Sequence, residues 1–231
     1  MLADDDLGLW VVADGMGGYE GGEIASRIAV DTIQEIFRRT ARDADATWPF
    51  KVDPLRSMEE NLALVAIRAA HLAIVAQREG RLASMGSTVA MVAADAGRAV
   101  VAHMGDSRVY RLRDGQLARL TRDHSFVEEM ALLDGTTGRV RGEASQFAHM
   151  ITRALGMPND HRPDVRVEAL RAGDVLVLCS DGLVEGLDDA QIADILGAAV
   201  PGDEASALAT AAHAAGARDN VTVVVVRVQD E

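Results

Sequence analysis

The sequence predicts an α+β fold in which two stacked, mainly antiparallel β-sheets lie between outer layers of helices. Strand-like segments follow one another across short turns, a spacing that favours antiparallel pairing. Several of these segments are continuously apolar rather than alternating, as in strands that are buried on both faces. Segments with helical periodicity stand apart from the strands. Together these observations indicate a four-layer α-β-β-α sandwich.

The N-terminal part opens with a short apolar strand at residues 9–13, which stops at the turn Asp14-Gly15. Apolar residues then recur at helical spacing over residues 23–37, and a second amphipathic pattern covers residues 58–79. The segment between them, residues 40–57, contains two prolines and reads as a surface loop. This part therefore predicts one strand followed by two helices.

The remainder alternates between strand and helix signals. Strands are expected at residues 87–94, 99–104, 108–112, 116–120, 165–169, 175–179 and 221–228, and helices at residues 190–199 and 204–215. Residues 121–162 are mixed and polar, with glycines that interrupt any long element, and we interpret them as a flap over a site. No Pro/Ser-rich stretch divides residues 1–231, so we expect a single domain.

Composition limits the possible partners and location. The 231 residues are 48% hydrophobic, enough for one sizeable core, and the formal net charge of −13 disfavours nucleic acid and anionic membrane surfaces. The apolar runs are too short to span a bilayer. One cysteine, Cys179, excludes an internal disulfide framework, and no leader pattern opens the sequence. We expect a cytoplasmic protein without a membrane span, and a monomer by default.

Four acidic residues lie at the ends of apolar strands. Asp14 and Asp181 follow such strands, Asp219 precedes one, and Asp106 lies between two. Each alone is most simply a turn residue. Together, carboxylates at one rim of a sandwich would repel one another unless cations intervened. Oxygen ligands without His or Cys are typical of Mg²⁺ or Mn²⁺ rather than zinc, and the glycine at Gly15 allows a tight turn beside the same ion.

Seven ordered blocks of the sequence resemble the bacterial PPM phosphatases, also called the PP2C-type family. The resemblance covers nearly the whole chain, and no single block would be specific without the others. The blocks are Asp14-Gly15-Met16-Gly17-Gly18, Gly21-Gly22-Glu23-Ile24-Ala25-Ser26, Met85-Gly86-Ser87-Thr88, Gly105-Asp106-Ser107-Arg108, Thr121-Arg122-Asp123-His124-Ser125, Ser180-Asp181-Gly182-Leu183 and Arg218-Asp219-Asn220-Val221-Thr222.

The resemblance implies a protein serine/threonine phosphatase with a binuclear metal centre at one end of the two sheets. By this likeness Asp14 bridges two Mn²⁺ or Mg²⁺ ions, Gly15 lends its carbonyl to the first, and Asp181 and Asp219 hold the second. Asp106 resembles the ligand of a third, weaker ion. Water activated by the metals would hydrolyse phosphoserine or phosphothreonine in proteins, and the expected partners are a cognate kinase or its substrates.

The sequence departs from the family pattern at the proton donor. Eukaryotic relatives have a histidine where this chain has Met16, and a thioether cannot donate a proton. Bacterial relatives share the methionine, so the leaving group would be protonated by a water at the metals or by a histidine elsewhere. His124 is the nearest candidate by motif, and a structural hydrogen-bonding role is the alternative for it.

A second departure lies at the front of the sequence. The family's first strand carries an Arg that grips the substrate phosphate, and it is not found in residues 1–231. The phosphate-binding residue therefore stays unassigned, and one sheet edge is expected to be unpaired. Either the start was assigned at an internal Met or the strand is lacking. Residues Asp4 to Asp6 read as a solvated turn.

Other chemistries fit less well. The main alternative is a pseudophosphatase that binds a kinase or phosphoprotein without turnover, although such a module has no physical need for clustered acids. A structural Ca²⁺ site fits the same ligands but leaves the Gly-Asp-Ser-Arg block unexplained. A cysteine phosphatase would need an Arg six residues after Cys179, where the chain has Glu185, so Cys179 is expected to be a buried strand residue.

Overall fold

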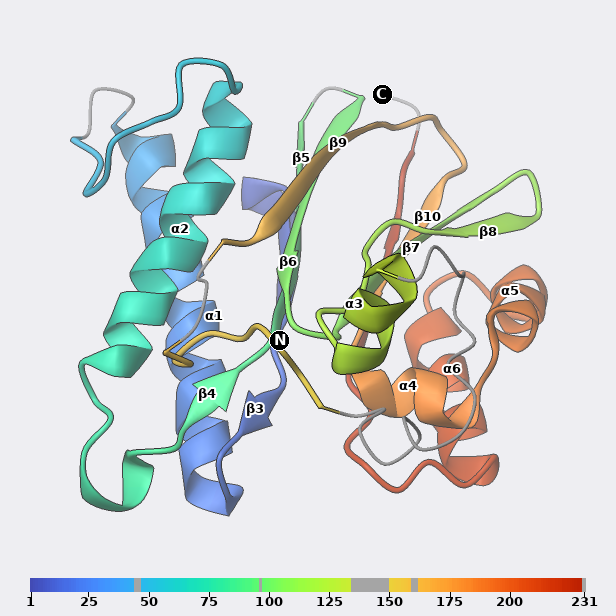
Figure 1. Cartoon of the computed structure of the whole chain (residues 1–231). Helices are drawn as coiled ribbons and strands as arrows, with labels where there is room; N and C mark the ends of the chain where they lie inside the picture. Colours follow the sequence, from blue (N-terminus) through green and yellow to red (C-terminus); the bar gives the residue numbers. More distant parts are fainter. Residues whose placement is uncertain (44–46, 96, 134–149, 159–161, 230–231) are drawn as a thin grey trace.

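The computed structural model describes residues 1–43, 47–95, 97–133, 150–158 and 162–229, and it contains two main antiparallel sheets (Figure 1). The five-stranded sheet has the order β1 (Leu2–Asp4), β2 (Leu9–Val12), β5 (Val89–Asp95), β6 (Arg98–Met104) and β9 (Asp164–Ala169). The four-stranded sheet has the order β11 (Val223–Arg227), β10 (Val175–Cys179), β7 (Arg108–Arg113) and β8 (Gln116–Arg119). A short ladder joins β3 (Gly15–Met16) to β4 (Gly86–Ser87).

Helices cover the outer faces of both sheets. Figure 1 shows α1 and α2 on one side of the molecule and α4, α5 and α6 on the other. The helices are α1 (Tyr19–Arg42), α2 (Met58–Val75), α3 (Phe126–Leu133), α4 (Asp181–Gly186), α5 (Asp189–Ala198) and α6 (Glu204–Ala214), with short 3₁₀ turns η1 (Asp5–Leu7) and η2 (Gly80–Leu82). Within these described residues, no helix is both long enough and apolar enough to cross a membrane.

Three buried clusters correspond to the three interfaces between four layers. The first cluster lies between helices α1 and α2 and the five-stranded sheet. The second lies between helices α4, α5 and α6 and the four-stranded sheet, and the third fills the space between the two sheets. In β2, Leu9 and Val11 pack toward the helices while Val12 faces the other sheet. Strands buried on both faces need apolar residues at every position, which explains their unbroken apolar runs. The predicted α-β-β-α sandwich is therefore confirmed.

The structure corrects several element boundaries. The first helix begins at Tyr19 rather than at Glu23, and it continues to Arg42. The second begins where expected, after the capping box of Ser57 and Glu60, but ends at Val75. Asp5 and Asp6 lie exposed in the turn η1, as expected. Asp4 does not belong to a solvated turn, because it pairs with β2 and its carboxylate accepts hydrogen bonds from the side chains of Gln34 and Arg38.

Part of the expected flap, residues 121–162, is packed into the fold. Thr121, His124 and Ser125 are buried, and Ser125 forms a β-bridge with Ile151. The helix α3 follows at once, which the sequence analysis did not predict. Residues 134–149 and 159–161 of the flap lie outside the described residues. The described start of this segment therefore forms part of the rim of the sandwich.

Candidate functional site

The structure brings three of the predicted acidic residues together at one end of the sheets. Asp14 follows β2, Asp181 starts α4 directly after β10, and Asp219 precedes β11. Burial raises the pKa of Asp14 to about 7, and the charges of Asp181 and Asp219, a hydrogen bond with Asp181 and the charge of Asp106 add to the effect. Interactions of this strength need carboxylates within a few ångströms of one another.

Asp181 and Asp219 line a cavity of about 520 Å³, and Asp14 is linked to it through its interaction with Asp181. Burial raises the pKa of Asp106 to about 6, and the charge of Asp181 contributes next. Asp106 therefore belongs to the same electrostatic cluster as Asp181. The residues that line the cavity are Asp106, Arg108, Asp123, Ser125, Asp181, Val184, Glu185, Arg218 and Asp219.

Backbone hydrogen bonds fix Asp14 in this cluster. Its amide donates to Thr88 Oγ1 at 3.0 Å, and its carbonyl accepts from the Thr88 amide at 2.8 Å and from Ser87 Oγ at 3.0 Å. Thr88 Oγ1 in turn lies 2.6 Å from Ser107 Oγ, next to Asp106. The hydroxyl side chains of Ser87, Thr88 and Ser107 thus help to hold the Asp14 backbone in place.

Gly15 follows Asp14 in β3 and is packed tightly against the first helix. A Cβ added at Gly15 would lie 1.8 Å from the carbonyl oxygen of Gly22, so no other residue fits without moving α1. A Cβ at Gly22 would likewise lie 2.6 Å from the Gly15 carbonyl oxygen, so both blocks need a glycine at this contact. It also fixes the direction in which the chain leaves Asp14.

The Ser180 hydroxyl links the loops of Asp181 and Asp219. It accepts a hydrogen bond from the Thr222 amide at 3.0 Å and donates one to the Asn220 carbonyl at 3.1 Å. Next to it, Gly182 approaches the same carbonyl so closely that a Cβ there would lie 2.5 Å from the Asn220 oxygen. The start of α4 and the loop before β11 are therefore locked together.

Glu185 gives a further link between the same two loops. It lies four residues after Asp181 on α4, and its Oε2 accepts hydrogen bonds from the amides of Arg218 at 3.1 Å and Asp219 at 3.4 Å. From the sequence alone, Glu185 stood out only as the residue that excludes a cysteine phosphatase. Its spacing of one helical turn from Asp181 is a signal that could have placed it at the site.

The residues present suit divalent cations. Burial raises the pKa of Asp181, the charge of Asp219 contributes next, and Asp181 Oδ1 is buried without a hydrogen-bond donor in the described structure. A buried carboxylate oxygen without a donor is costly unless a cation satisfies it. The candidate ligands that line the cavity are carboxylates, the donors that Mg²⁺ and Mn²⁺ prefer.

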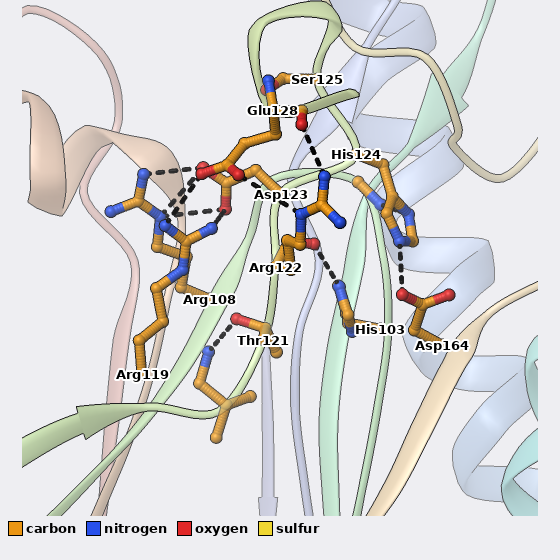
Figure 2. Close-up of polar contacts among 12 residues, drawn as sticks. His103, Arg108, Arg119, Thr121, Arg122, Asp123, His124, Ser125, Glu128 and Asp164 are labelled. Atoms are coloured by element: carbon orange, nitrogen blue, oxygen red, sulfur yellow. Dashed lines mark hydrogen bonds and ion pairs between the residues drawn. The ribbon is translucent and has the colours of Figure 1, made fainter. Parts of the chain in front are cut away.

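A charged network borders the cavity (Figure 2). The Arg108 guanidinium donates to Asp123 through Nε at 3.0 Å and Nη2 at 2.7 Å, and through Nη1 to the Tyr110 hydroxyl at 3.0 Å. Arg119 also donates to Asp123, at 2.6 Å, and it faces Glu128 at 3.6 Å. This network was not predictable from the sequence, because nothing in the spacing of these residues shows that β7 and the 121–125 segment meet.

His124 lies outside the residues that line the cavity and has a different set of contacts. Its Nδ1 accepts a hydrogen bond from the Gly105 amide at 3.2 Å, and its Nε2 faces Asp164 at 3.4 Å (Figure 2). Since Nδ1 is an acceptor, the proton of the neutral ring is on Nε2. Burial lowers the pKa of His124 to about 4. The charges of His103 and Arg153 lower this pKa further, whereas the charge of Asp164 raises it.

His103, His124 and Asp164 could suggest a second metal site, because their ligand atoms lie within 4.8 Å of one another. The hydrogen bonds argue against it. His124 would need a free lone pair at Nε2, which requires a proton on Nδ1 facing the Gly105 N–H. His103 stacks on His124 at 4.6 Å, and its Nε2 lies 2.7 Å from the Arg122 carbonyl. The trio therefore fits a hydrogen-bonded support of the Gly105 turn.

Comparison with known proteins shows the family to which this chain is related. Residues 2–222 match the family model described as protein phosphatase 2C. Protein phosphatase PhpP of Streptococcus pneumoniae is 32% identical over 224 residues, which are 96% of this chain and 86% of the relative. PstP of Mycobacterium tuberculosis, a serine/threonine protein phosphatase, is 35% identical over 227 residues, 96% of this chain and 40% of that longer protein.

Solved structures give the same result. The catalytic domain of PstP in complex with two manganese ions superposes with a TM-score of 0.77 at 33% identity, covering 96% of this chain and 88% of that one. The serine/threonine phosphatase of S. agalactiae gives a TM-score of 0.80 at 32% identity, with 96% and 87% covered. From the family match and these relatives, this chain belongs to the protein phosphatase 2C family.

Proposed function

We propose that this chain is a metal-dependent phosphatase that hydrolyses phosphoserine and phosphothreonine in proteins. The observation that carries the proposal is the convergence of Asp14 with Asp181 and Asp219, two of the residues that line the cavity. The charges of Asp181 and Asp219 raise the pKa of Asp14, and carboxylates placed in this way gain from cations between them. The names of the relatives, which are serine/threonine phosphatases, support the substrate class.

In this proposal Asp14, Asp181 and Asp219 hold two divalent cations, with the Gly15 carbonyl as a further ligand and Asp106 at a third, weaker site. Bound cations would supply charge neutralisation and activation of water for attack on phosphorus. The two manganese ions in the PstP complex support Mn²⁺, and the oxygen donors suit Mg²⁺ as well. The carboxylates position these charges, while Ser180 and Glu185 hold the loops that carry them.

The leaving alkoxide must take up a proton. His124 was one expected source, but its Nε2–H faces Asp164 and it does not line the cavity. These contacts favour water as the proton source and a structural role for His124.

We further propose that the partners are phosphorylated proteins or a cognate kinase. We also propose that residues 1–231 form one domain, that the protein is a monomer, and that it is cytoplasmic, which fits the single buried Cys179.

Steady-state hydrolysis of a phosphothreonine peptide tests the proposal. With Mn²⁺ we expect turnover, and with excess EDTA or with Asp181→Asn we expect a rate lower by about a hundredfold or more, since metal catalysis is worth several kcal/mol. Asp31→Asn is the matched control. It makes the same charge change as Asp181→Asn, but on the exposed face of α1, where the Asp31 side chain is 69% accessible.

Two results would contradict the proposal. A rate that is insensitive to both EDTA and Asp181→Asn would exclude the metal mechanism. Absence of turnover, with the phosphopeptide still bound, would instead indicate a binding protein.

A further inference from the structure

The cavity has an excess of negative charge. Asp106, Asp123, Asp181, Glu185 and Asp219 line it, against two arginines, Arg108 and Arg218. A phosphate monoester carries close to two negative charges at neutral pH. Even where cations neutralise the carboxylates that hold them, a substrate phosphate entering this cavity gains from a protein cation that can form charge-assisted hydrogen bonds with it.

Arg108 is already occupied. Its guanidinium donates to both carboxylate oxygens of Asp123 and to the Tyr110 hydroxyl, and its side chain is only 20% accessible. Moving it onto a substrate would leave Asp123 with Arg119 alone in a partly buried position. Since removing one partner of a buried ion pair costs several kcal/mol, Arg108 is poorly suited to bind substrate.

Arg218 differs in both respects. Its side chain is exposed, and in the described part of the chain no hydrogen bond or ion pair involves its guanidinium. Its backbone, in contrast, is fixed, because the Arg218 amide donates to Glu185 Oε2 at 3.1 Å. The same carboxylate oxygen accepts from the amide of Asp219, so Arg218 is held at a set position next to a candidate metal ligand.

We propose that Arg218 is a phosphate-binding residue of this site, which contacts the non-bridging oxygens of the substrate's phosphate from the cavity wall. The planar guanidinium can donate two parallel hydrogen bonds to a phosphate, and Arg218 breaks no pair with the residues that the structure describes to do so. The inference rests on the proposed phosphatase function. It goes further by assigning substrate affinity to a residue beside Asp219 rather than to the metals alone.

Kinetics of the full chain with saturating Mn²⁺ test the assignment. Arg218→Ala should raise KM for a phosphothreonine peptide about tenfold and raise the inhibition constant of inorganic phosphate by a similar factor, because a charge-assisted hydrogen bond is lost. We expect kcat to change less than about threefold. Arg218→Lys should recover part of both effects, since it keeps the charge but not the paired donors.

Arg27→Ala is the control. It removes the same charge as Arg218→Ala from an exposed position on α1, where the Arg27 side chain is 79% accessible. The inference is overturned if KM and the phosphate inhibition constant of Arg218→Ala stay within twofold of those of Arg27→Ala. It is also overturned if kcat and the Mn²⁺ concentration for half-maximal activity change instead, which would show that Arg218 acts only through Asp219. A wild-type chain without turnover would refute the proposed function itself, and this inference with it.

Discussion

Among single residues, His124 shows how burial limits the chemistry of a titratable side chain. The ring is 1% exposed, stacks on His103 and is bounded by Asp164 and Arg153. Burial and the neighbouring positive charges outweigh the attraction of Asp164, so the pKa is about 4. At neutral pH the ring is therefore uncharged, with Nδ1 engaged by the Gly105 amide.

This environment predicts a pH-dependent stability. The pKa of His124 falls from the ordinary value of 6.5 to about 4 on folding, so its contribution to stability is present above pH 6.5 and is lost as pH falls through 4. Asn at position 124 does not titrate. In denaturant unfolding, the free-energy advantage of wild type over His124→Asn should therefore shrink steadily between pH 6.5 and 4. A difference independent of pH would contradict this account.

The same variant tests the proton-donor alternative. General acid catalysis by a positioned side chain contributes typically 10²–10⁴-fold, so loss of a true donor should lower kcat by at least about a hundredfold. We expect a decrease of less than about tenfold for His124→Asn. Measured at pH 7.5 with Mn²⁺ and a phosphothreonine peptide, a larger fall in kcat with an unchanged melting temperature would assign the proton to His124.

At the scale of elements, α4 is a short helix that holds two parts of the site together. It begins at Asp181, and its second residue, Gly182, touches the Asn220 carbonyl. The six-residue helix carries too few turns to show periodicity, so the sequence analysis could place Asp181 but not the helix. The long helices α1 and α2 and the apolar strands were predictable because their patterns extend over many residues.

The surroundings of two helical glycines, Gly182 on α4 and Gly197 on α5, predict opposite effects when each is replaced by alanine. Gly182→Ala should destabilise the protein by about 1–3 kcal/mol, because its Cβ would overlap the Asn220 carbonyl at 2.5 Å, and activity should fall as Asp181 and Asp219 separate. Gly197→Ala on α5 should stabilise by roughly 0.5–1 kcal/mol, because a Cβ there meets nothing within 4 Å. Denaturant unfolding measures both. Equal effects at the two positions would show that the contact with Asn220 is unimportant.

Local pattern also explains what was misread at other elements. Asp4 was read as part of a solvated turn because three consecutive aspartates are polar. Its actual role depends on Gln34 and Arg38, thirty or more positions away, whose side chains donate to it. The helix α3 was hidden in the polar segment that was read as a flap. In both cases tertiary contacts, which no local pattern contains, determine the structure.

At the scale of the whole molecule, the site forms where the ends of both sheets meet. Asp14 follows a strand of the five-stranded sheet, Asp106 lies in the connection from that sheet to the four-stranded sheet, and Asp181 and Asp219 flank strands of the four-stranded sheet. The sequence indicated these acids because each adjoins an apolar strand. It could not indicate that Arg108 is paired with Asp123, since this depends on the distance between β7 and the 121–125 segment in the folded chain.

Because the cations would bridge both sheets, their removal should weaken the whole fold. A ligand at a hundred times its Kd adds about 2.7 kcal/mol of stability, or roughly 5–10 °C in Tm for a chain of this length. In thermal unfolding, Mn²⁺ should raise the wild-type Tm by this amount relative to EDTA.

Asp181→Asn removes one of the repelling charges, so in EDTA this variant should melt no lower than wild type. With Mn²⁺ it should lose more than half of the gain in Tm that wild type shows. Asp31→Asn, exposed on α1, should keep the full gain. An equal response of Asp181→Asn and Asp31→Asn to Mn²⁺ would show that the cations bind elsewhere, because only a site shared between the strand ends makes the stability of the sandwich depend on Asp181.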